Sequence, residues 1–227
     1  MYAKFDFSAE IAENYEQKCL CVLVLDTSGS MYGEPIKELN KGLQDFYEEI
    51  YKDETTSQRL EIAIISFNSV VNLIQEPALI ENITIPKLKS TGSTAMATAV
   101  NNAIKLVEDR KKWYKETGQK YCRPWIILMT DGDPDSDQDM ETLASKIKSD
   151  TSEKRYVFLP IGVQGANMRV LDSIKGTLPP MMLKGTRFSD FFKWLSASMG
   201  AVVKAEDGEK FVISSSNSDD WMNSFSI

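Results

Sequence analysis

Short runs of apolar residues alternate along the chain with longer segments in which apolar residues recur every three or four positions. The apolar runs predict strands, and the run at 19–25, which is not amphipathic, predicts a central strand buried on both faces of a sheet. The three-and-four spacing is typical of amphipathic helices that cover such a sheet. We predict strands at residues 18–25, 60–67, 123–130, 156–163 and 181–183. We predict helices at residues 34–52, about 94–115, 140–147, 167–174 and 188–199.

One further strand is predicted at residues 70–75, which follow the strand at 60–67 after a short turn at Asn68 and Ser69. Such a hairpin pairs its strands antiparallel, and it would lie at the sheet edge. All other strands alternate with helices, which favours parallel pairing. The predicted fold class is therefore α/β, with a doubly wound, mostly parallel central sheet, one antiparallel edge strand and helices on both faces.

The predicted α/β domain covers residues 18–200. Residues 1–17 are predicted to be an N-terminal extension. After Gly200 the composition changes, with one possible hairpin arm and then a run of small polar residues, at 207–213 and 214–221. We therefore predict that residues 201–227 form a C-terminal extension that is partly mobile.

Composition narrows the range of functions. The chain has 227 residues, a formal net charge of -7 and no histidine. The negative charge argues against nucleic acid and anionic membranes as partners. The lack of histidine excludes Ser-His-Asp catalysis and histidine zinc sites.

Three cysteines, Cys19, Cys21 and Cys122, lack metal-ligand spacing and are interpreted as reduced core thiols. The sequence shows neither the apolar region of a signal peptide nor an apolar run of membrane-spanning length. A cytoplasmic location is therefore predicted.

Candidate chemistry follows the first predicted strand directly. Asp26, Ser28 and Ser30 lie on the loop between that strand and the helix that Pro35 begins. Open α/β sheets bind their ligands at the carboxyl ends of the strands. One carboxylate and two hydroxyls are hard oxygen ligands, which suit Mg²⁺ or Mn²⁺ and do not suit zinc. The alternative is that these side chains only cap the next helix.

The Asp-x-Ser-x-Ser pattern resembles the first segment of the metal-ion-dependent adhesion site of von Willebrand factor A domains. That site has two further segments on later loops. Thr94, after a glycine-containing turn, resembles the second, and Asp131, after the strand at 123–130, resembles the third. All three segments occur in order, each at a strand end or a loop above the sheet.

The resemblance implies that Ser28, Ser30 and Thr94 bind the metal through their hydroxyls, with Asp26 and Asp131 binding directly or through water. Mg²⁺ is the expected ion, and Mn²⁺ or Ca²⁺ is possible. Three neutral hydroxyls and at most two carboxylates, either of which can bind through water, leave the divalent ion incompletely neutralised. We therefore predict a protein partner that presents an Asp or Glu carboxylate to the metal.

A narrower resemblance is to bacterial TerY-type A domains from tellurite-resistance and stress operons. It rests on residues 25–31, 33–36, 128–132, 158–163, 165–168 and 188–199. This resemblance implies an adaptor in a bacterial stress or conflict system, with a kinase and a phosphatase as possible partners. The alternative function is a phosphorylation substrate or regulator of such a kinase and phosphatase pair, in which the metal site is only structural.

An enzyme is the less favoured hypothesis. A haloacid-dehalogenase-type phosphatase would carry a second aspartate where this chain has Ser28, and no Walker-type phosphate loop is present. Asp133, Asp135 and Asp137 alternate as in a calcium loop but lack its glycine and final glutamate, so helix capping and solvation are expected. The basic and aromatic residues 110–115 are interpreted as a solvated helix end, with a partner patch as the alternative.

Overall fold

The computed structural model describes residues 5–10, 14–163 and 165–204. Its centre is a six-stranded sheet with the strand order β3-β2-β1-β4-β5-β6. Every neighbouring pair is parallel except β2 and β3, which are antiparallel. The strands are β1 (Cys19–Asp26), β2 (Leu60–Phe67), β3 (Val71–Leu79), β4 (Trp125–Thr130), β5 (Val157–Gly162) and β6 (Met181–Met182). The predicted fold class, including the antiparallel edge strand, is confirmed.

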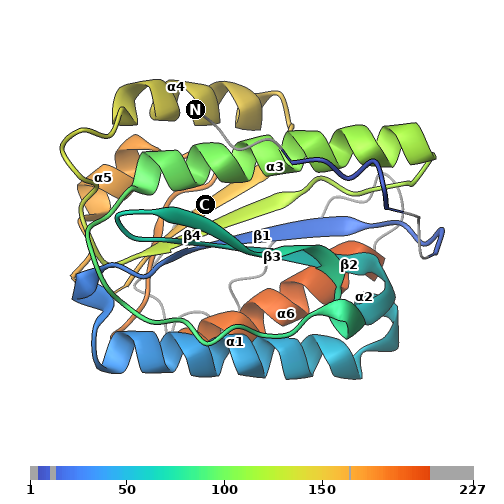
Figure 1. Cartoon of the computed structure of the whole chain (residues 1–227), viewed down its shortest axis with the longest axis horizontal. Helices are drawn as coiled ribbons and strands as arrows, with labels where there is room; N and C mark the ends of the chain where they lie inside the picture. The colour runs from blue at the N-terminus through green and yellow to red at the C-terminus, as the bar shows by residue number, and fades with distance from the viewer. Residues whose placement is uncertain (1–4, 11–13, 164, 205–227) are drawn as a thin grey trace.

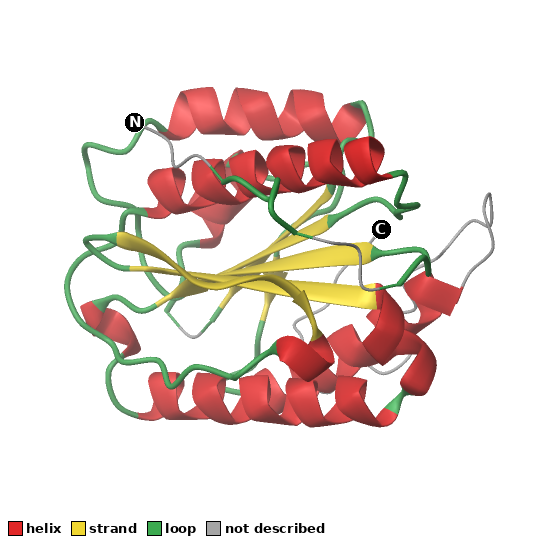
Figure 2. Ribbon diagram, turned by 45° about the vertical axis from the view of Figure 1, so that its right-hand side comes forward, coloured by secondary structure: helices red, strands yellow, loops and turns green. Residues whose placement is uncertain are grey.

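Helices cover both faces of this sheet, so the molecule has three layers (Figures 1 and 2). One face carries α1 (Glu34–Lys52), α2 (Glu54–Arg59) and α6 (Phe188–Lys204). The other face carries α3 (Met96–Thr117), α4 (Met140–Ser152) and α5 (Met168–Ser173). Two short 3-10 helices, η1 (Gly29–Met31) and η2 (Ile80–Asn82), lie in the connections.

The β1 strand is the centre of both cores, because all eight of its residues are buried. Alternate side chains enter opposite layers, as the period of a strand requires. One set packs under α3 with Phe158, namely Leu20, Val22 and Val24. The other packs against α1 and α6, namely Cys19, Cys21, Leu23 and Leu25. The uninterrupted apolar run therefore reflects burial on two faces.

Several element boundaries differ from the predicted ones. The edge strand β3 continues to Leu79, and the closing helix α6 continues to Lys204. The α2 helix was not predicted; its first turn is capped by Asp53, whose side chain accepts from the Thr56 N–H at 3.0 Å. The predicted hairpin arm at 207–213 and the mobile segment at 214–221 lie outside the described residues.

The interpretation of residues 110–115 as a solvated helix end is wrong for three of the six residues. Arg110, Trp113 and Tyr114 are all buried. The Arg110 guanidinium makes two 2.9 Å hydrogen bonds to Glu61 of β2, and its centre lies 4.0 Å from the Trp113 ring. Glu61 is far away in sequence, so the local pattern of charges gave no sign of the ion pair that draws this helix end inward.

The cysteines lie where the sequence predicts. Cys19 and Cys21 are buried, Cys122 is partly buried, and none of the three forms a disulfide. Within the described ranges, no helix combines the length and apolar character needed to cross a membrane.

The α1 and α6 helices are in close contact at Gly42. A β-carbon added there would lie 2.7 Å from Cδ2 of Phe192 and 3.1 Å from the backbone carbon of Phe188. The Phe192 ring also packs on Phe46 of α1, with 5.4 Å between ring centroids. The absence of a side chain at Gly42 therefore lets the aromatic face of α6 lie directly on α1.

We predict that Gly42→Ala destabilises the fold. A glycine-to-alanine change inside a helix normally stabilises by about 1 kcal/mol, but here the methyl group overpacks the interface, which costs roughly 1–3 kcal/mol. Urea unfolding measures the difference, with Lys41→Ala, exposed on the same turn, as the control. A Gly42→Ala protein more stable than the wild type would show that the two helices are not in close contact.

Candidate metal centre

The Asp26 carboxylate lies at the carboxyl end of β1 and is fully buried. The Ser28 N–H donates to its Oδ1 at 2.7 Å, and the Thr130 hydroxyl donates to its Oδ2 at 2.5 Å. Thr130 comes from the end of the neighbouring strand β4, so the pairing of β1 with β4 brings the donor to the carboxylate. Both oxygens of Asp26 are therefore held in place by neighbouring residues.

A chain of hydroxyls joins the β1 loop to the β4 loop. The Ser28 and Ser30 Oγ atoms are 3.0 Å apart, and the Ser30 hydroxyl donates to Oδ1 of Asp131 at 2.7 Å. Because the Ser30 proton points at Asp131, a lone pair of Ser30 Oγ remains available to a cation. Ser28 is buried whereas Ser30 is exposed, so this chain leads from the interior to the surface.

The Thr94 loop is held by Asp135, a residue that the sequence analysis assigned to capping and solvation. The Thr94 N–H lies 3.1 Å from both carboxylate oxygens of Asp135, and the Ser93 hydroxyl donates to Oδ2 at 2.7 Å. In return, the Asp135 N–H donates to the Thr94 carbonyl at 3.0 Å. Asp139 caps α4 instead, by accepting from the Thr142 N–H. Asp135 therefore positions Thr94 beside the other two loops.

A backbone hydrogen bond also joins the first two loops. The Gly29 N–H donates to the Gly92 carbonyl at 2.9 Å. Gly92 has φ +74, a left-handed conformation that favours glycine. The turn before Thr94 is thus fixed against the serine loop by its own backbone.

Three predicted ligand oxygens converge beside Gly132. A β-carbon added to this glycine would lie 3.4 Å from Thr94 Oγ1, 3.7 Å from Ser30 Oγ and 3.9 Å from Asp26 Oδ2. One oxygen comes from each of the first two loops and one from the end of β1, and Gly132 leaves the space beside them clear. Ser28 and Asp131 join this group through the hydroxyl of Ser30. The structure therefore brings together all five residues predicted from the sequence.

The charged forms of Asp26 and Asp131 are disfavoured in this arrangement. Burial raises the pKa of Asp26, and the charge of Asp131 raises it further, against the opposing hydrogen bonds from Ser28 and Thr130. Burial likewise raises the pKa of Asp131, against the hydrogen bond from Ser30. A cation bound between the two carboxylates would lower both pKa values by favouring the charged forms.

The donor set fits a small hard cation. Carboxylate and hydroxyl oxygens are ligands for Mg²⁺ or Mn²⁺, and the group contains no nitrogen or sulfur donor. No group of three or more Asp, Glu, Cys or His side chains in the described part of the chain is placed to hold a metal. A cation here would consequently depend on the neutral hydroxyls of Ser28, Ser30 and Thr94, which leave part of its charge uncompensated.

Sequence reasoning missed three residues that shape this group, namely Thr130, Gly132 and Asp135. Thr130 and Gly132 flank the predicted Asp131, but no pattern distinguishes a hydrogen-bond donor or an open space from ordinary loop residues.

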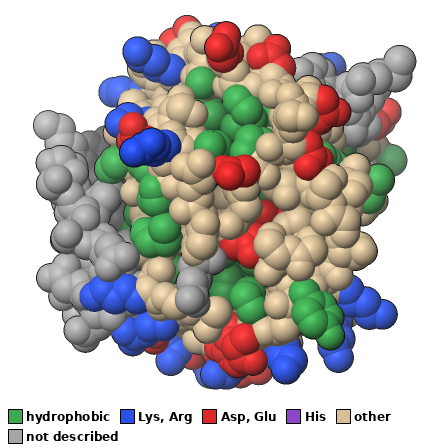
Figure 3. Space-filling model, turned by 90° about the vertical axis from the view of Figure 1, so that its left-hand side faces the viewer, with side chains coloured by type: hydrophobic (Ala, Val, Ile, Leu, Met, Phe, Trp, Pro, Cys, Tyr) green, Lys and Arg blue, Asp and Glu red, His purple; other side chains and the backbone are tan. Residues whose placement is uncertain are grey.

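Figure 3 shows the face that contains the carboxyl ends of the parallel strands, with acidic side chains near its middle and uncharged surface around them. Tyr32, one residue after η1, is 81% exposed.

Comparisons with known proteins agree with this architecture. The sequence profile of the von Willebrand factor type A domain matches residues 21–192. No curated protein sequence matches the chain. Similar solved structures include the ArnB paralog VWA2 from Sulfolobus acidocaldarius, at a TM-score of 0.56 and 17% identity, covering 82% of this chain and 46% of that one.

Two further structures belong to bacterial proteins. The pilus adhesin SpaC from Lactobacillus rhamnosus GG has a TM-score of 0.63 and 12% identity, over 82% of this chain and 31% of that one. The conserved hypothetical protein BatB from Bacteroides thetaiotaomicron has a TM-score of 0.52 and 15% identity, over 82% of this chain and 100% of that one.

Because the sequence identities to these three structures are only 12–17%, the structural similarity is evidence for the fold alone. The chain spans less than half of the archaeal protein and of the adhesin. The family assignment rests on the sequence profile, whose match from residue 21 to residue 192 covers more than half of the 227 residues. This chain belongs to the von Willebrand factor type A domain family.

Proposed function

We propose that this chain is a protein-interaction domain that uses a divalent cation, Mg²⁺ in the first instance, to bind a carboxylate of its partner. The cation would be held by the hydroxyls of Ser28, Ser30 and Thr94, with Asp26 and Asp131 binding directly or through water. The observation that carries the proposal is the convergence of oxygens from separate loops beside Gly132, at the carboxyl ends of the central strands β1 and β4.

The arrangement favours binding over catalysis. Asp26 is buried and both of its oxygens are engaged, so it is poorly placed to attack a substrate. Ser28 stands where a phosphatase of the haloacid-dehalogenase type would need its second aspartate. A divalent cation held directly by neutral hydroxyls, with a carboxylate binding through water, keeps an affinity for a further anionic oxygen. An Asp or Glu on a partner protein supplies such an oxygen and adds a charged contact to the interface.

Membership of the von Willebrand factor type A family supports a role in protein interaction. Two of the proteins that share the fold are described as a pilus adhesin and a minor pilin. The narrower proposal, an adaptor in a bacterial stress or tellurite-resistance system beside a kinase and a phosphatase, rests on the six sequence segments that resemble TerY-type domains. The alternative function is a phosphorylation substrate or regulator; the serines at 214–218 are its candidate phosphorylation sites, and they lie outside the described residues.

Gly132→Ala tests the proposal without removing a ligand. The added methyl group would be in ordinary contact with Thr94, Ser30 and Asp26 and, since Gly132 has no positive φ, causes little strain. It would, however, crowd the space that the cation needs. At about a hundred times its Kd, Mg²⁺ should stabilise the wild type by roughly 2.7 kcal/mol. We expect the variant to lose this stabilisation and, with it, the capture of partner proteins.

Thermal unfolding of the wild type and of Gly132→Ala in Mg²⁺ or in EDTA measures the stabilisation by the cation. Affinity capture with the same two proteins as bait measures partner binding. Thr142→Ala, an exposed substitution on α4, is the control and should behave as the wild type. The proposal is wrong if the wild type captures the same partner equally well in EDTA.

Because the pKa of Asp26 is raised, we predict that the free energy of unfolding of the metal-free protein depends on pH. Because the folded-state pKa exceeds the unfolded-state pKa, the native state binds more protons between the two values, and stability falls as pH rises through that window. An Asn side chain can accept from the Ser28 N–H with its oxygen and donate from its amide nitrogen to the Thr130 hydroxyl oxygen, so it retains two hydrogen bonds without the charge. In EDTA, Asp26→Asn should therefore be more stable than the wild type near neutral pH, with the difference shrinking in acid.

Denaturant unfolding at several pH values measures this difference, and Asp133→Asn, exposed on the β4 loop, serves as the control. Addition of Mg²⁺ should stabilise the wild type and leave Asp26→Asn unchanged. An Asp26→Asn protein that is less stable than the wild type in EDTA at neutral pH would contradict the assigned electrostatics.

A further inference from the structure

An uncharged strip of exposed surface runs beside the proposed metal centre. It consists of Tyr32 and Gly29 on the β1 loop, Gly92 on the Thr94 loop, and Ser69 and Val70 in the turn between β2 and β3, all of them exposed. Figure 3 shows this end of the molecule, where uncharged surface surrounds the central acidic side chains. The strip therefore offers contacts of a different kind from the carboxylates beside it.

Contacts between the loops make the uncharged strip continuous. The Tyr32 N–H donates to the Gly29 carbonyl at 3.1 Å, and the Gly29 N–H donates to the Gly92 carbonyl at 2.9 Å. A β-carbon added to Gly92 would lie 2.5 Å from Ser69 Oγ, so Gly92 lies directly against the β2–β3 turn. The strip consequently has Tyr32 at one end and Val70 at the other.

The β2–β3 turn is tied to the loop that carries Thr94. The N–H groups of the residues before and after Thr94 donate to this turn, one to Ser69 Oγ at 2.8 Å and the other to the Asn68 carbonyl at 2.8 Å. Val70 is held by two hydrogen bonds with Asn68, each 3.0 Å long. Its side chain is therefore presented from a pre-organised position, which lowers the entropy that binding costs.

Both ends of the uncharged strip expose a large apolar side chain. Tyr32 is 81% exposed and Val70 is 58% exposed. Only three other large hydrophobic residues in the described part of the chain are exposed, namely Tyr15, Tyr51 and Ile74. Single exposed apolar residues are common on soluble proteins, but these two share one continuous strip with the loops of the candidate metal centre. Exposed apolar and aromatic side chains in such a place are typical of a protein interface.

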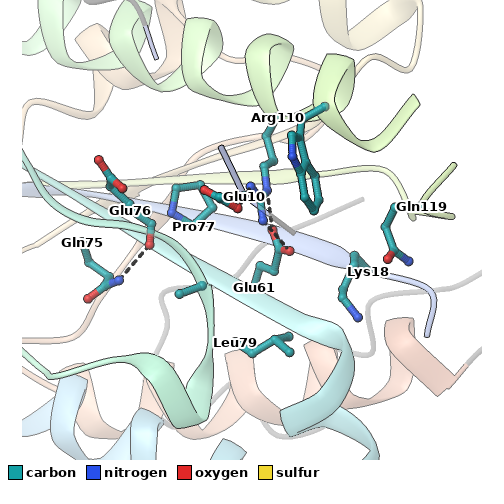
Figure 4. Close-up of a pocket in the computed structure, with 11 residues that line it drawn as sticks. Glu10, Lys18, Glu61, Gln75, Glu76, Pro77, Leu79, Arg110 and Gln119 are labelled. Carbon is teal, nitrogen blue, oxygen red and sulfur yellow. Dashed lines mark hydrogen bonds and ion pairs between the residues drawn. The ribbon is translucent and has the colours of Figure 1, made fainter. Parts of the chain in front are cut away.

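The opposite end of the sheet differs, because its charged side chains are bonded within the protein. A pocket of about 390 Å³ lies there, built from the N-terminal segment, the beginnings of β1 and β2, the end of β3 and the end of α3 (Figure 4). Arg110 makes two hydrogen bonds to Glu61, and the Lys18 ammonium donates to backbone carbonyls. Gln119 Oε1 has no donor among the described residues but is buried. The candidate interaction surface is therefore the strip, not this pocket.

We propose that the metal-bound partner docks on the uncharged strip and carries its Asp or Glu between apolar side chains. This inference rests on the proposed function. Gly29 lies between the predicted ligands Ser28 and Ser30, so the middle of the strip adjoins the cation. With the partner's carboxylate on the cation, one apolar side chain packs on Tyr32 and another on Val70. Charged neighbours of that carboxylate are disfavoured, because the strip would desolvate them without pairing them.

Selection from two phage-displayed peptide libraries tests the proposal. The central residue of every peptide is fixed, as Asp in one library and as Asn in the other, with random residues on both sides. Both libraries are selected on the immobilised whole chain in Mg²⁺ and eluted with EDTA. We expect EDTA to release peptides from the Asp library only, enriched in aromatic and branched apolar residues beside the Asp and depleted in charged ones.

Calorimetric titration with the most enriched peptide, synthesised free of phage, measures the contribution of each end of the strip. Tyr32→Ser should weaken binding by about tenfold, as loss of an aromatic contact does, and Val70→Ser by about threefold. Tyr15→Ser is the matched control, because Tyr15 is 83% exposed at the opposite end of the sheet. The stabilisation by Mg²⁺ in thermal unfolding should be the same in all three variants as in the wild type, since none removes a metal ligand.

The outcomes separate this inference from the proposed function. If EDTA releases no more peptides from the Asp library than from the Asn library, the metal-bridged contact is wrong and the inference is overturned with it. If Asp peptides are released without a preference for apolar neighbours, the inference alone is overturned. It is also overturned if Tyr32→Ser or Val70→Ser binds the enriched peptide as tightly as Tyr15→Ser does.

Discussion

The buried carboxylate of Asp26 is the constraint on which the proposed function depends. It lies at the end of the central strand, in a place that parallel pairing with β2 and β4 determines. Burial raises its pKa, and two hydrogen bonds compensate only part of that cost. A buried charge is tolerated when it is paired or coordinates a metal. In the proposed function, the surrounding hydroxyls supply the remaining ligands of such a metal.

The sequence predicted most of the fold, because its main signals are local. The apolar run of β1 and the three-and-four spacing of α1 each follow from burial of the element itself. The five site residues were identified through a family resemblance, since nothing in their spacing alone places Thr94 beside Asp26. The structure places them together, and whether they bind a metal stays a prediction.

The features that the sequence did not predict depend on partners distant in the chain. Asp135 holds the Thr94 loop across 41 positions, and Glu61 draws Arg110 inward across 49. Neither pairing has a local pattern, so Asp135 was assigned to solvation and Arg110 to a solvated helix end. The same long-range pairing builds the pocket around Gln119, whose lining residues come from five segments of the chain. Side chains that are brought together only by the fold are therefore where sequence reasoning is weakest.

The sheet thus presents different chemistry at its two ends. At the carboxyl ends of the parallel strands, two carboxylates and three hydroxyls form an oxygen-rich group suited to a hard cation. At the amino ends, the basic side chains are paired internally and an amide oxygen remains without a donor. The two ends are joined by β1, all of whose residues are buried.

The central claim is that one divalent cation binds between the β1, Thr94 and β4 loops. Crystals grown with Mn²⁺ and measured at its absorption edge locate the ion directly by anomalous scattering. We predict one strong peak beside Gly132, within coordination distance of hydroxyl oxygens of Ser28, Ser30 and Thr94. If crystals grown in saturating Mn²⁺ show no peak among these oxygens, or show their peak elsewhere on the chain, the account is contradicted.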